Sequence, residues 1–157
     1  MLTEEFEQRI IGMQDTHWRV ACTLLSQPCD REDAISECIL KALKKRESLR
    51  DDRYMKTWLI RILINECYAI LRRNRRVIPS EDVPAFTPAK DADPEVFHAL
   101  FALEEKFRLP MVLYYVEGYS TKEISKILHL PAGTVSTRLS RGRRKIKAEM
   151  EASDNAQ

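Results

Sequence analysis

The most informative part of the sequence is GYSTKEISKILHLPAGTVSTRLSRGRRKIK, which covers residues 118–147. Gly118 suits the end of one helix, and Ser120 or Thr121 can cap the start of the next. If Ser120 is the cap, Glu123 stands where a capping box needs it. A short helix should follow, because apolar side chains recur at helical spacing. Its apolar face is Ile124, Ile127 and Leu128.

A second, longer helix should come directly afterwards. His129 and Leu130 predict a tight turn, and Pro131 suits the first position of a helix. The buried face of this helix is Val135, Leu139 and Ile146. Polar and basic residues are left to its exposed sides, namely Thr134, Ser136, Thr137, Arg138 and Arg141. A short helix, a tight turn and a longer basic helix together predict a helix-turn-helix.

Such a unit lays its second helix in the major groove of DNA, where arginine can donate two hydrogen bonds to guanine. The alternative, a helical hairpin in an ordinary bundle, does not explain why the arginines are exposed and lack acidic partners nearby in the sequence. The chain has a net charge of only +2, but residues 134–147 hold six positive charges and no negative one. Residues 72–76 hold four more arginines. Two basic patches favour nucleic acid over a solvated charged face, which would intersperse acids among the bases.

The rest of the chain predicts an all-α fold. Its 157 residues include only 4 glycines and 7 prolines, which disfavours a turn-rich β sandwich. A helical stripe covers residues 6–24, with Thr3 as its cap and Pro28 as its end. A second helix should begin with a cap at Asp30, and a third should cover residues 55–70.

Residues 79–94 predict a linker between two small domains. They contain four of the prolines and four acidic side chains, which favours an extended acidic segment. The predicted domains are therefore residues 1–78 and residues 95–150. In the second domain, Pro110 lies in the first turn of a helix over residues 111–116, or kinks a helix that begins near Glu104.

Several classes of function find no support. No uncharged run approaches the roughly 18 to 20 residues of a membrane span, and the N-terminus is acidic where a signal peptide is basic. We therefore expect a cytoplasmic protein without membrane insertion. The cysteines form no C-x-x-C pair and show no zinc-site spacing, so we predict no metal site and no cofactor. Cys22, Cys38 and Cys67 lie among apolar residues and are interpreted as core side chains.

Three sets of segments resemble a known family. Residues 118–124, 130–135 and 138–143 closely resemble region 4 of bacterial sigma factors, and the best match is the small extracytoplasmic-function (ECF) group. Residues 30–37 look like region 2.2 of that family. Residues 56–73 look like its regions 2.3 and 2.4. The resemblance covers nearly the whole chain, in order and with a linker of the expected kind.

The resemblance implies a sigma factor that binds core RNA polymerase and directs promoter-specific initiation, in response to stress or an envelope signal. Region 2.2 of the family docks on the largest polymerase subunit, and the matching residues are Asp30, Glu32, Asp33, Ser36 and Glu37. Regions 2.3 and 2.4 recognise and melt the minus-ten element, and the matching residues are Lys56, Trp58, Arg61, Asn65, Tyr68, Arg72, Arg73, Arg75 and Arg76.

Region 4 of the family reads the minus-thirty-five element of promoter DNA and touches the flap of the second-largest subunit. The matching residues are Thr134, Ser136, Thr137, Arg138, Arg141, Arg143, Arg144 and Lys145. The resemblance also implies an anti-sigma factor as a partner. Gly142 departs from the family pattern, because it stands in a helix where a helix former is usual and costs about 1 kcal/mol relative to alanine.

Some alternatives stay open at this point. Trp58 suits base stacking or core packing equally well, since Leu59, Ile62 and Leu63 adjoin it. The acids of residues 30–37 would also suit an ordinary solvated helix. A stand-alone repressor or activator would bind duplex DNA without polymerase, usually as a dimer. A nucleic-acid enzyme has the least support, because the sequence contains no P-loop and no nucleophile–base spacing.

Overall fold

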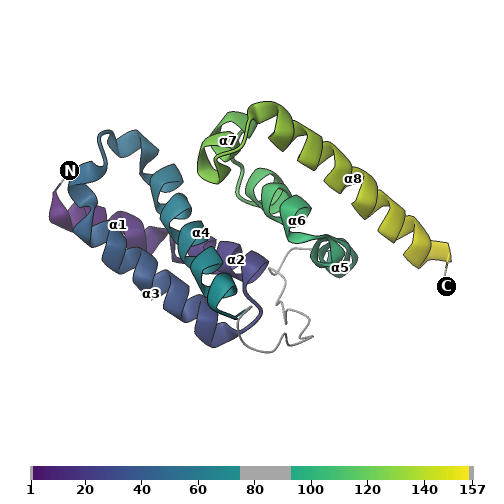
Figure 1. Ribbon diagram of the computed structural model, residues 1–157, viewed down its shortest axis with the longest axis horizontal. Coiled ribbons are helices and arrows are strands. Elements are labelled where there is room, and N and C mark those ends of the chain that lie inside the picture. Colours follow the sequence, from purple (N-terminus) through teal and green to yellow (C-terminus); the bar gives the residue numbers. More distant parts are fainter. Residues whose placement is uncertain (1, 75–92, 156–157) are drawn as a thin grey trace. The chain divides into compact units, whose positions relative to one another are not determined.

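The computed structural model describes residues 2–74 and 93–155, and every regular element in these ranges is a helix (Figure 1). The predicted all-α fold class is therefore confirmed. The chain divides into two compact units, Met1–Pro84 and Ala85–Gln157, so the division falls inside the predicted linker. Residues 79–92 of that linker lie outside the described residues, as do Arg75 and Arg76.

The described part of unit 1, residues 2–74, contains four α-helices with two short 3-10 turns before the last. The helices are α1 (Thr3–Gly12), α2 (Gln14–Leu24), α3 (Pro28–Lys44) and α4 (Met55–Asn74), and the 3-10 turns are Arg46–Ser48 and Asp52–Tyr54. α4 packs against both α3 and α2. The core forms along α4, where Leu59, Ile60 and Leu63 have no exposed surface.

The single helix predicted over residues 6–24 is wrong, because the chain breaks at Met13. The Met13 N–H donates to the Ile10 carbonyl over 3.0 Å, which closes a four-residue turn where α1 ends and α2 follows. The apolar stripe continues through the break, and Ile10, Met13 and His17 are all buried. The periodicity therefore contains no sign of the interruption.

Two predicted helix caps in unit 1 are also wrong. Thr3 is the first residue of α1, and Leu2 precedes it without a capping side-chain bond. α3 begins at Pro28 rather than after Asp30, since proline has the φ of a first helical turn and lacks only an N–H that would be unsatisfied there. Pro28 thus opens α3, and the preceding helix has already ended at Leu24.

Three of the four thiols lie in the core of unit 1, as predicted. Cys22, Cys38 and Cys67 are at most 3% exposed, and each comes from a different helix. Burial raises the pKa of Cys38 and of Cys67 to about 12, and it also raises the pKa of Cys22. These thiols are therefore protonated at neutral pH. Cys29 is exposed.

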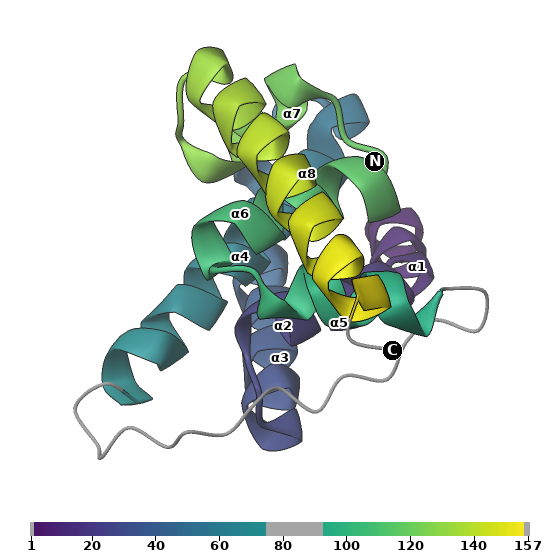
Figure 2. The ribbon, with the colours of Figure 1, turned by 90° about the vertical axis from the view of Figure 1, so that its right-hand side faces the viewer.

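Unit 2 is arranged around its last helix. Its elements are α5 (Pro94–Ala102), α6 (Glu105–Met111), a π-helical turn (Val112–Val116), α7 (Thr121–Leu128) and α8 (Ala132–Asn155). α5, α6 and α7 all pack against α8, which Figure 2 shows crossing the unit. The helical domain predicted for residues 95–150 continues as α8 to Asn155.

Pro110 lies inside α6, so a helix that begins near Glu104 is the correct alternative, and the first-turn position is wrong. The α-helix gives way to the π turn directly afterwards, where the Glu117 N–H donates to the Val112 carbonyl over 3.0 Å. Pro110 also lacks the N–H that would bond to the Lys106 carbonyl, so the α-helical hydrogen bonding is already interrupted before the π turn. The π turn exposes Tyr114 and Tyr115 at the surface.

Packing against α6 explains why a glycine stands at position 142 of α8. It is buried, and a Cβ at this position would lie 2.9 Å from Met111 Cγ and 3.0 Å from its Sδ. Only glycine lets α8 approach α6 this closely without moving Met111. The cost in helix propensity is therefore a consequence of how α6 and α8 pack.

Candidate nucleic-acid and protein interfaces

The predicted helix-turn-helix is present as α7 and α8. Ser120 Oγ accepts from the Glu123 N–H over 3.1 Å, and Glu123 Oε1 accepts from the Ser120 N–H over 3.0 Å. This is the capping box that the sequence predicts. His129 ends α7 in the left-handed region, at φ 54°, and thereby forms the tight turn.

The start of α8 differs from the prediction by one residue. Pro131 precedes the helix, and its carbonyl accepts from the N–H groups of Thr134 and Val135. The predicted apolar faces hold for Ile124, Ile127, Val135 and Leu139, which are buried. Leu128 and Ile146 are only half-buried. The buried positions of α8 face its neighbouring helices, and the other sides of α8 are more exposed.

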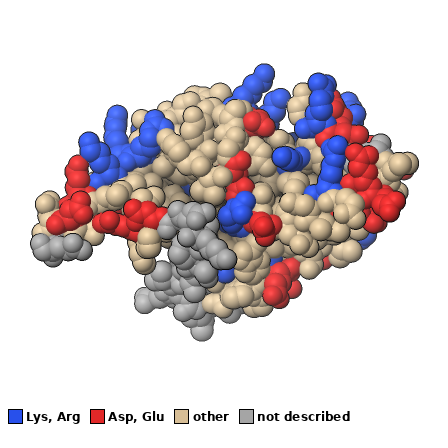
Figure 3. Space-filling view, turned by 180° about the vertical axis from the view of Figure 1, so that it is seen from behind, with Lys and Arg blue, Asp and Glu red and all other residues tan. Residues whose placement is uncertain are grey.

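The predicted polar and basic residues of α8 lie on those other sides. Thr134 and Arg138 are half-buried, and the exposed ones are Ser136, Thr137, Arg141, Arg143, Arg144 and Lys145. Thr137 Oγ1 donates back to the Gly133 carbonyl over 2.9 Å. Positive side chains gather along one edge of unit 2, at the left of Figure 3. Within residues 2–74 and 93–155, neither Arg141 nor Arg144 forms an ion pair.

Two of these basic residues contact aromatic side chains of their own unit. Arg143 Nη1 donates to the Tyr115 hydroxyl over 2.9 Å, although the two residues are 28 positions apart. Lys145 Nζ lies 5.2 Å from the centroid of the Phe107 ring. Sequence spacing contains no signal for either contact.

Five of the residues matched to regions 2.3 and 2.4 form one stripe along α4. They are Trp58, Arg61, Asn65, Tyr68 and Arg72, separated by alternating steps of three and four residues. Asn65 and Arg72 are exposed, whereas the other three are half-buried. Lys56 and Arg73 are exposed on other sides of α4. We call the five residues the α4 stripe.

Trp58 has a packing role within unit 1. Its ring lies edge-on to Phe6 of α1, with 6.2 Å between the ring centroids. The predicted alternative of core packing therefore applies to one side of this ring. Trp58 is half-buried, so another part of its surface is accessible.

The acidic residues matched to region 2.2 lie along α3. Glu32, Asp33, Ser36 and Glu37 are exposed. Asp30 is half-buried, and its Oδ2 accepts from Asn74 Nδ2 of α4 over 3.2 Å. Leu40 and Leu43 continue the same side of the helix and are 50% and 41% exposed. Sequence reasoning missed these two leucines, although steps of three and four from Ser36 lead to both.

Further contacts fix α3 within unit 1. The buried Arg31 donates from Nε to the Leu25 carbonyl over 2.8 Å and lies 5.6 Å from the Trp18 ring centroid, so it closes the connection between α2 and α3. An ion pair between Lys41 and Glu66 joins α3 to α4. The hydrogen bond that Lys41 donates to the Glu66 carboxylate raises the pKa of Lys41. The acidic side of α3 and the α4 stripe therefore belong to one rigid packing arrangement.

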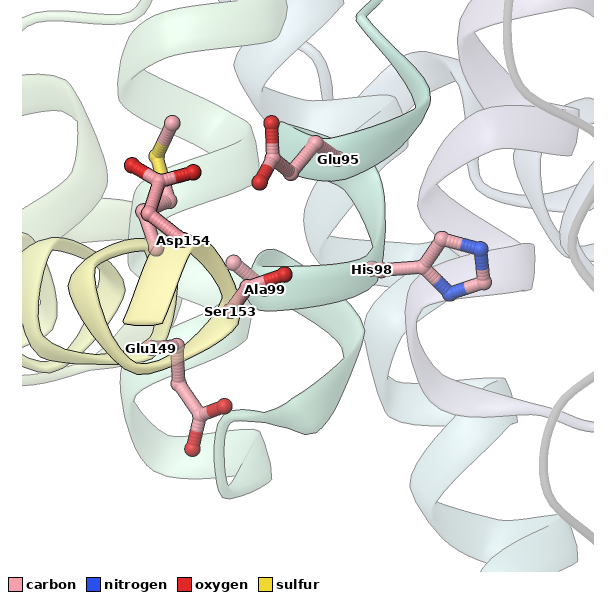
Figure 4. A pocket seen from close by; sticks show the side chains of 7 residues that line it. Glu95, His98, Ala99, Glu149, Ser153 and Asp154 are labelled. Atoms are coloured by element: carbon pink, nitrogen blue, oxygen red, sulfur yellow. The ribbon is translucent and has the colours of Figure 1, made fainter. Parts of the chain in front are cut away.

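A polar cavity lies between α5 and α8 in unit 2, next to Glu95, His98, Glu149 and Asp154 (Figure 4). His98 points away from the carboxylates in that view. Among the residues that the structure describes, no group of three or more histidine, cysteine, aspartate or glutamate side chains could hold a metal ion. No helix in the described ranges is long and apolar enough to cross a membrane.

Comparison with known proteins adds to this geometry. Residues 13–77 match the family model described as Sigma-70 region 2, and residues 95–146 match the one described as Sigma-70, region 4. The chain is 29% identical to the RNA polymerase sigma-E factor of Streptomyces coelicolor, over 96% of this chain and 88% of that protein. It is 30% identical to the ECF RNA polymerase sigma-E factor of Escherichia coli, over 78% of this chain and 74% of that protein.

A solved structure of similar fold is the sigma factor RpoE from Bartonella quintana, crystallised with the anti-sigma factor NepR. It aligns with a TM-score of 0.83 and 26% identity, over 95% of this chain and 98% of that one. CnrH in complex with the cytosolic domain of CnrY aligns with a TM-score of 0.70 at 21% identity, which shows likeness of fold.

Proposed function

Because this chain belongs to the ECF group of RNA polymerase sigma factors and serves promoter-directed transcription initiation, we propose that its two units divide this work. Unit 2 binds the minus-thirty-five element, and unit 1 binds core polymerase and the minus-ten element. The observation that carries the proposal is the capped helix-turn-helix, whose second helix exposes Arg141 and Arg144 without acidic partners among the described residues.

In unit 2, α8 enters the major groove of the minus-thirty-five element. Arg138 and Arg141 lie on the first half of the helix, where a recognition helix meets base edges. A guanidinium can donate to both acceptors of guanine, which discriminates bases by about 1 to 3 kcal/mol. Thr134, Ser136 and Thr137 are close enough in sequence to contact the adjoining phosphates. Those remaining basic residues of α8 that reach phosphates add affinity without sequence discrimination.

In unit 1, the α4 stripe binds the minus-ten element. Separating the strands costs a few kcal/mol for unstacking, which capture of exposed bases can offset. Asn65 can hydrogen-bond a base edge, and Tyr68 and the accessible part of Trp58 can stack on one. Arg72 holds the backbone at the end of the stripe. Lys56, Arg73, Arg75 and Arg76 supply further phosphate contacts around it.

The exposed side of α3 binds the largest subunit of core polymerase. Leu40 and Leu43 offer an apolar centre, and Glu32, Asp33 and Glu37 with Ser36 offer an acidic border. An apolar centre with a charged border is the usual anatomy of a protein interface, and it suits a basic partner surface. Asp30 belongs at the edge of this surface, because Asn74 holds it toward α4.

Other partners follow from the family. We propose that unit 2 touches the flap of the second-largest subunit and that an anti-sigma factor holds the protein inactive until a stress or envelope signal arrives. The solved relative from Bartonella quintana is bound to an anti-sigma factor, which supports a regulator of that kind. The protein then works in the cytoplasm as a non-catalytic factor, since the polymerase performs the chemistry.

Paired variants test this division of work. Asp33→Lys with Glu37→Lys should weaken the affinity for core polymerase about tenfold or more while the fold is kept, because both side chains are exposed. The matched control is Glu7→Lys, an exposed acid on α1. Arg138→Ala with Arg141→Ala should keep the core affinity but lose selection of the upstream element. Exchanged outcomes, or equal effects on both properties, would contradict the assignment of roles.

A further inference from the structure

The basic run of α8 winds around the helix, so its charges face different surroundings. Residues three or four positions apart lie on the same side of a helix, whereas consecutive residues are about a quarter of a turn apart around its axis. Arg143 and Lys147 therefore share one side, and Arg138 and Lys145 share another. Arg144 lies between these two sides, facing away from the unit, and Arg141 lies beside it.

The side of Arg143 and Lys147 belongs to a groove. Both residues line a cavity of about 570 Å³ between α5, the π turn and α8, together with Phe97, Leu100 and Tyr115. Arg143 is fixed at this rim by its hydrogen bond of 2.9 Å to the Tyr115 hydroxyl. Tyr115 stands out from the surface because the π turn presents it there.

Lys145 lies at the junction with α6, further along α8 than Arg138. The Lys145 ammonium lies over the ring of Phe107, and the Lys106 ammonium lies 5.1 Å from the same ring centroid. Phe107 is 4% exposed, so its ring position is fixed by the core of unit 2. A cation over an aromatic face at this distance is held electrostatically. Lys145 thus connects α8 to α6.

The outward residues have no such attachment. Arg144 and Arg141 are exposed, and neither forms a hydrogen bond, ion pair or ring contact in the part of the chain that the structure describes. Arg138 is half-buried and likewise has none there. Their guanidinium groups are available to a partner without first giving up a contact.

We propose that the charges of this run have two roles: Arg138, Arg141 and Arg144 contact DNA, whereas Arg143 and Lys145 are positioning residues that hold α8 against the π turn and α6. The inference rests on the proposed function, since it concerns how unit 2 meets the minus-thirty-five element. It removes Arg143 and Lys145 from the phosphate contacts that the sequence predicts.

Salt dependence distinguishes the two roles. Each phosphate that a basic side chain neutralises steepens the log–log dependence of affinity on salt by about 0.9. Three contacts in this run would contribute a slope of about −2.7, and six would contribute about −5.4. A positioning residue changes the affinity at every salt concentration and leaves the slope unchanged.

The experiment uses holoenzyme assembled from core polymerase and the full chain. The wild-type holoenzyme first selects a duplex from a random-sequence pool, and this duplex is the labelled probe in titrations between about 0.1 and 0.3 M salt, a range over which phosphate contacts change the affinity strongly. Arg143→Ala and Arg144→Ala form the matched pair, because they are neighbouring, exposed arginines in one helix. Lys145→Ala tests the other attachment. Tyr115→Phe removes only the hydroxyl that Arg143 binds.

We expect Arg144→Ala to reduce the magnitude of the slope by about 0.9, and Arg143→Ala and Lys145→Ala to leave it unchanged. Arg143→Ala and Tyr115→Phe should lower the affinity alike, by about threefold, the effect of one exposed hydrogen bond. A reduced slope for Arg143→Ala or Lys145→Ala, or an unchanged slope for Arg144→Ala, would overturn the inference. A pool in which the wild-type holoenzyme enriches no duplex would instead contradict the proposed function, and the inference with it.

Discussion

α4 and α8 are the longest helices of their units, and they differ in how much of their surface is committed to packing. α4 has 20 residues and buries seven of them, whereas α8 has 24 and buries three. Packing on α4 leaves most of the residues matched to regions 2.3 and 2.4 on one stripe. On α8, packing leaves several sides exposed. The position of a basic residue along this helix therefore does not by itself predict whether its side chain contacts DNA or its own unit. The assignment of α8 charges therefore depends on neighbours such as Tyr115 and Phe107.

The largest expected effect comes from cavities in the two cores. Leu59→Ala in α4 and Leu139→Ala in α8 each remove a buried side chain, 0% and 3% exposed, and should each cost about 3 kcal/mol of unfolding free energy. If the units fold independently, each variant lowers the denaturation midpoint of its own unit only. Urea titrations followed by residue-specific NMR signals measure both midpoints. A shift of both units by either variant would show that the two cores are coupled.

A smaller effect should separate the units at alkaline pH. Cys38 and Cys67 have pKa values of about 12 against 9.0 for a free thiol, so the unfolded chain releases these protons first. The stability that they contribute is therefore complete below about pH 9 and is lost as the pH rises toward 12. At pH 10 the loss in unit 1 should be about 2 to 3 kcal/mol.

Tyr119 is the counterpart in unit 2. Burial and the nearby Glu117 raise its pKa to about 12 from 10.0, so unit 2 should lose stability only above about pH 10. Denaturation midpoints between pH 8 and pH 10.5 measure the difference. The control is Cys38→Ala with Cys67→Ala, which should flatten the pH dependence of unit 1 and leave that of unit 2 unchanged. An equal decline in both units of the wild type would contradict the thiol explanation.

The smallest effect concerns two glycines of α8. Gly133 has open space where a Cβ would lie, so Gly133→Ala should stabilise unit 2 by about 0.5 kcal/mol. Gly142→Ala gains the same helix propensity but places its Cβ against Met111, and it should be neutral or destabilising. Thermal unfolding of the two variants tests the pair. Equal stabilisation by both would mean that α8 and α6 are not in close contact at Gly142.

What the sequence could predict depended on how local the determining interactions are. The capping box spans four residues and the turn at His129 only a few more, so α7 and the start of α8 were predictable to within one residue. The break at Met13 was not, because the same apolar positions pack on both sides of it. Pro110 is compatible with the first turn of a helix or with the interior of one. The structure has Pro110 inside α6, and α6 packs against α8.

The candidate sites follow the same rule. The α4 stripe was predictable, because helical spacing alone brings its five residues to one side. The contacts of Arg143 and Lys145 join residues far apart in sequence and depend on how α8 packs. The sequence could therefore predict a cluster of basic residues but not which of them have partners within the unit. Leu40 and Leu43 are apolar, so their residue type gives no sign of exposure, although helical spacing places them on the side of Ser36.

The most direct test of the proposed function is size-exclusion chromatography of the full chain with bacterial core RNA polymerase. The proposal predicts a stable complex of one chain per core, which the Asp33→Lys with Glu37→Lys variant forms more weakly than the Glu7→Lys control. A folded wild-type chain that elutes apart from core at micromolar concentrations, with no anti-sigma factor present, would contradict it. The stand-alone regulator would then be the better explanation for the helix-turn-helix of unit 2.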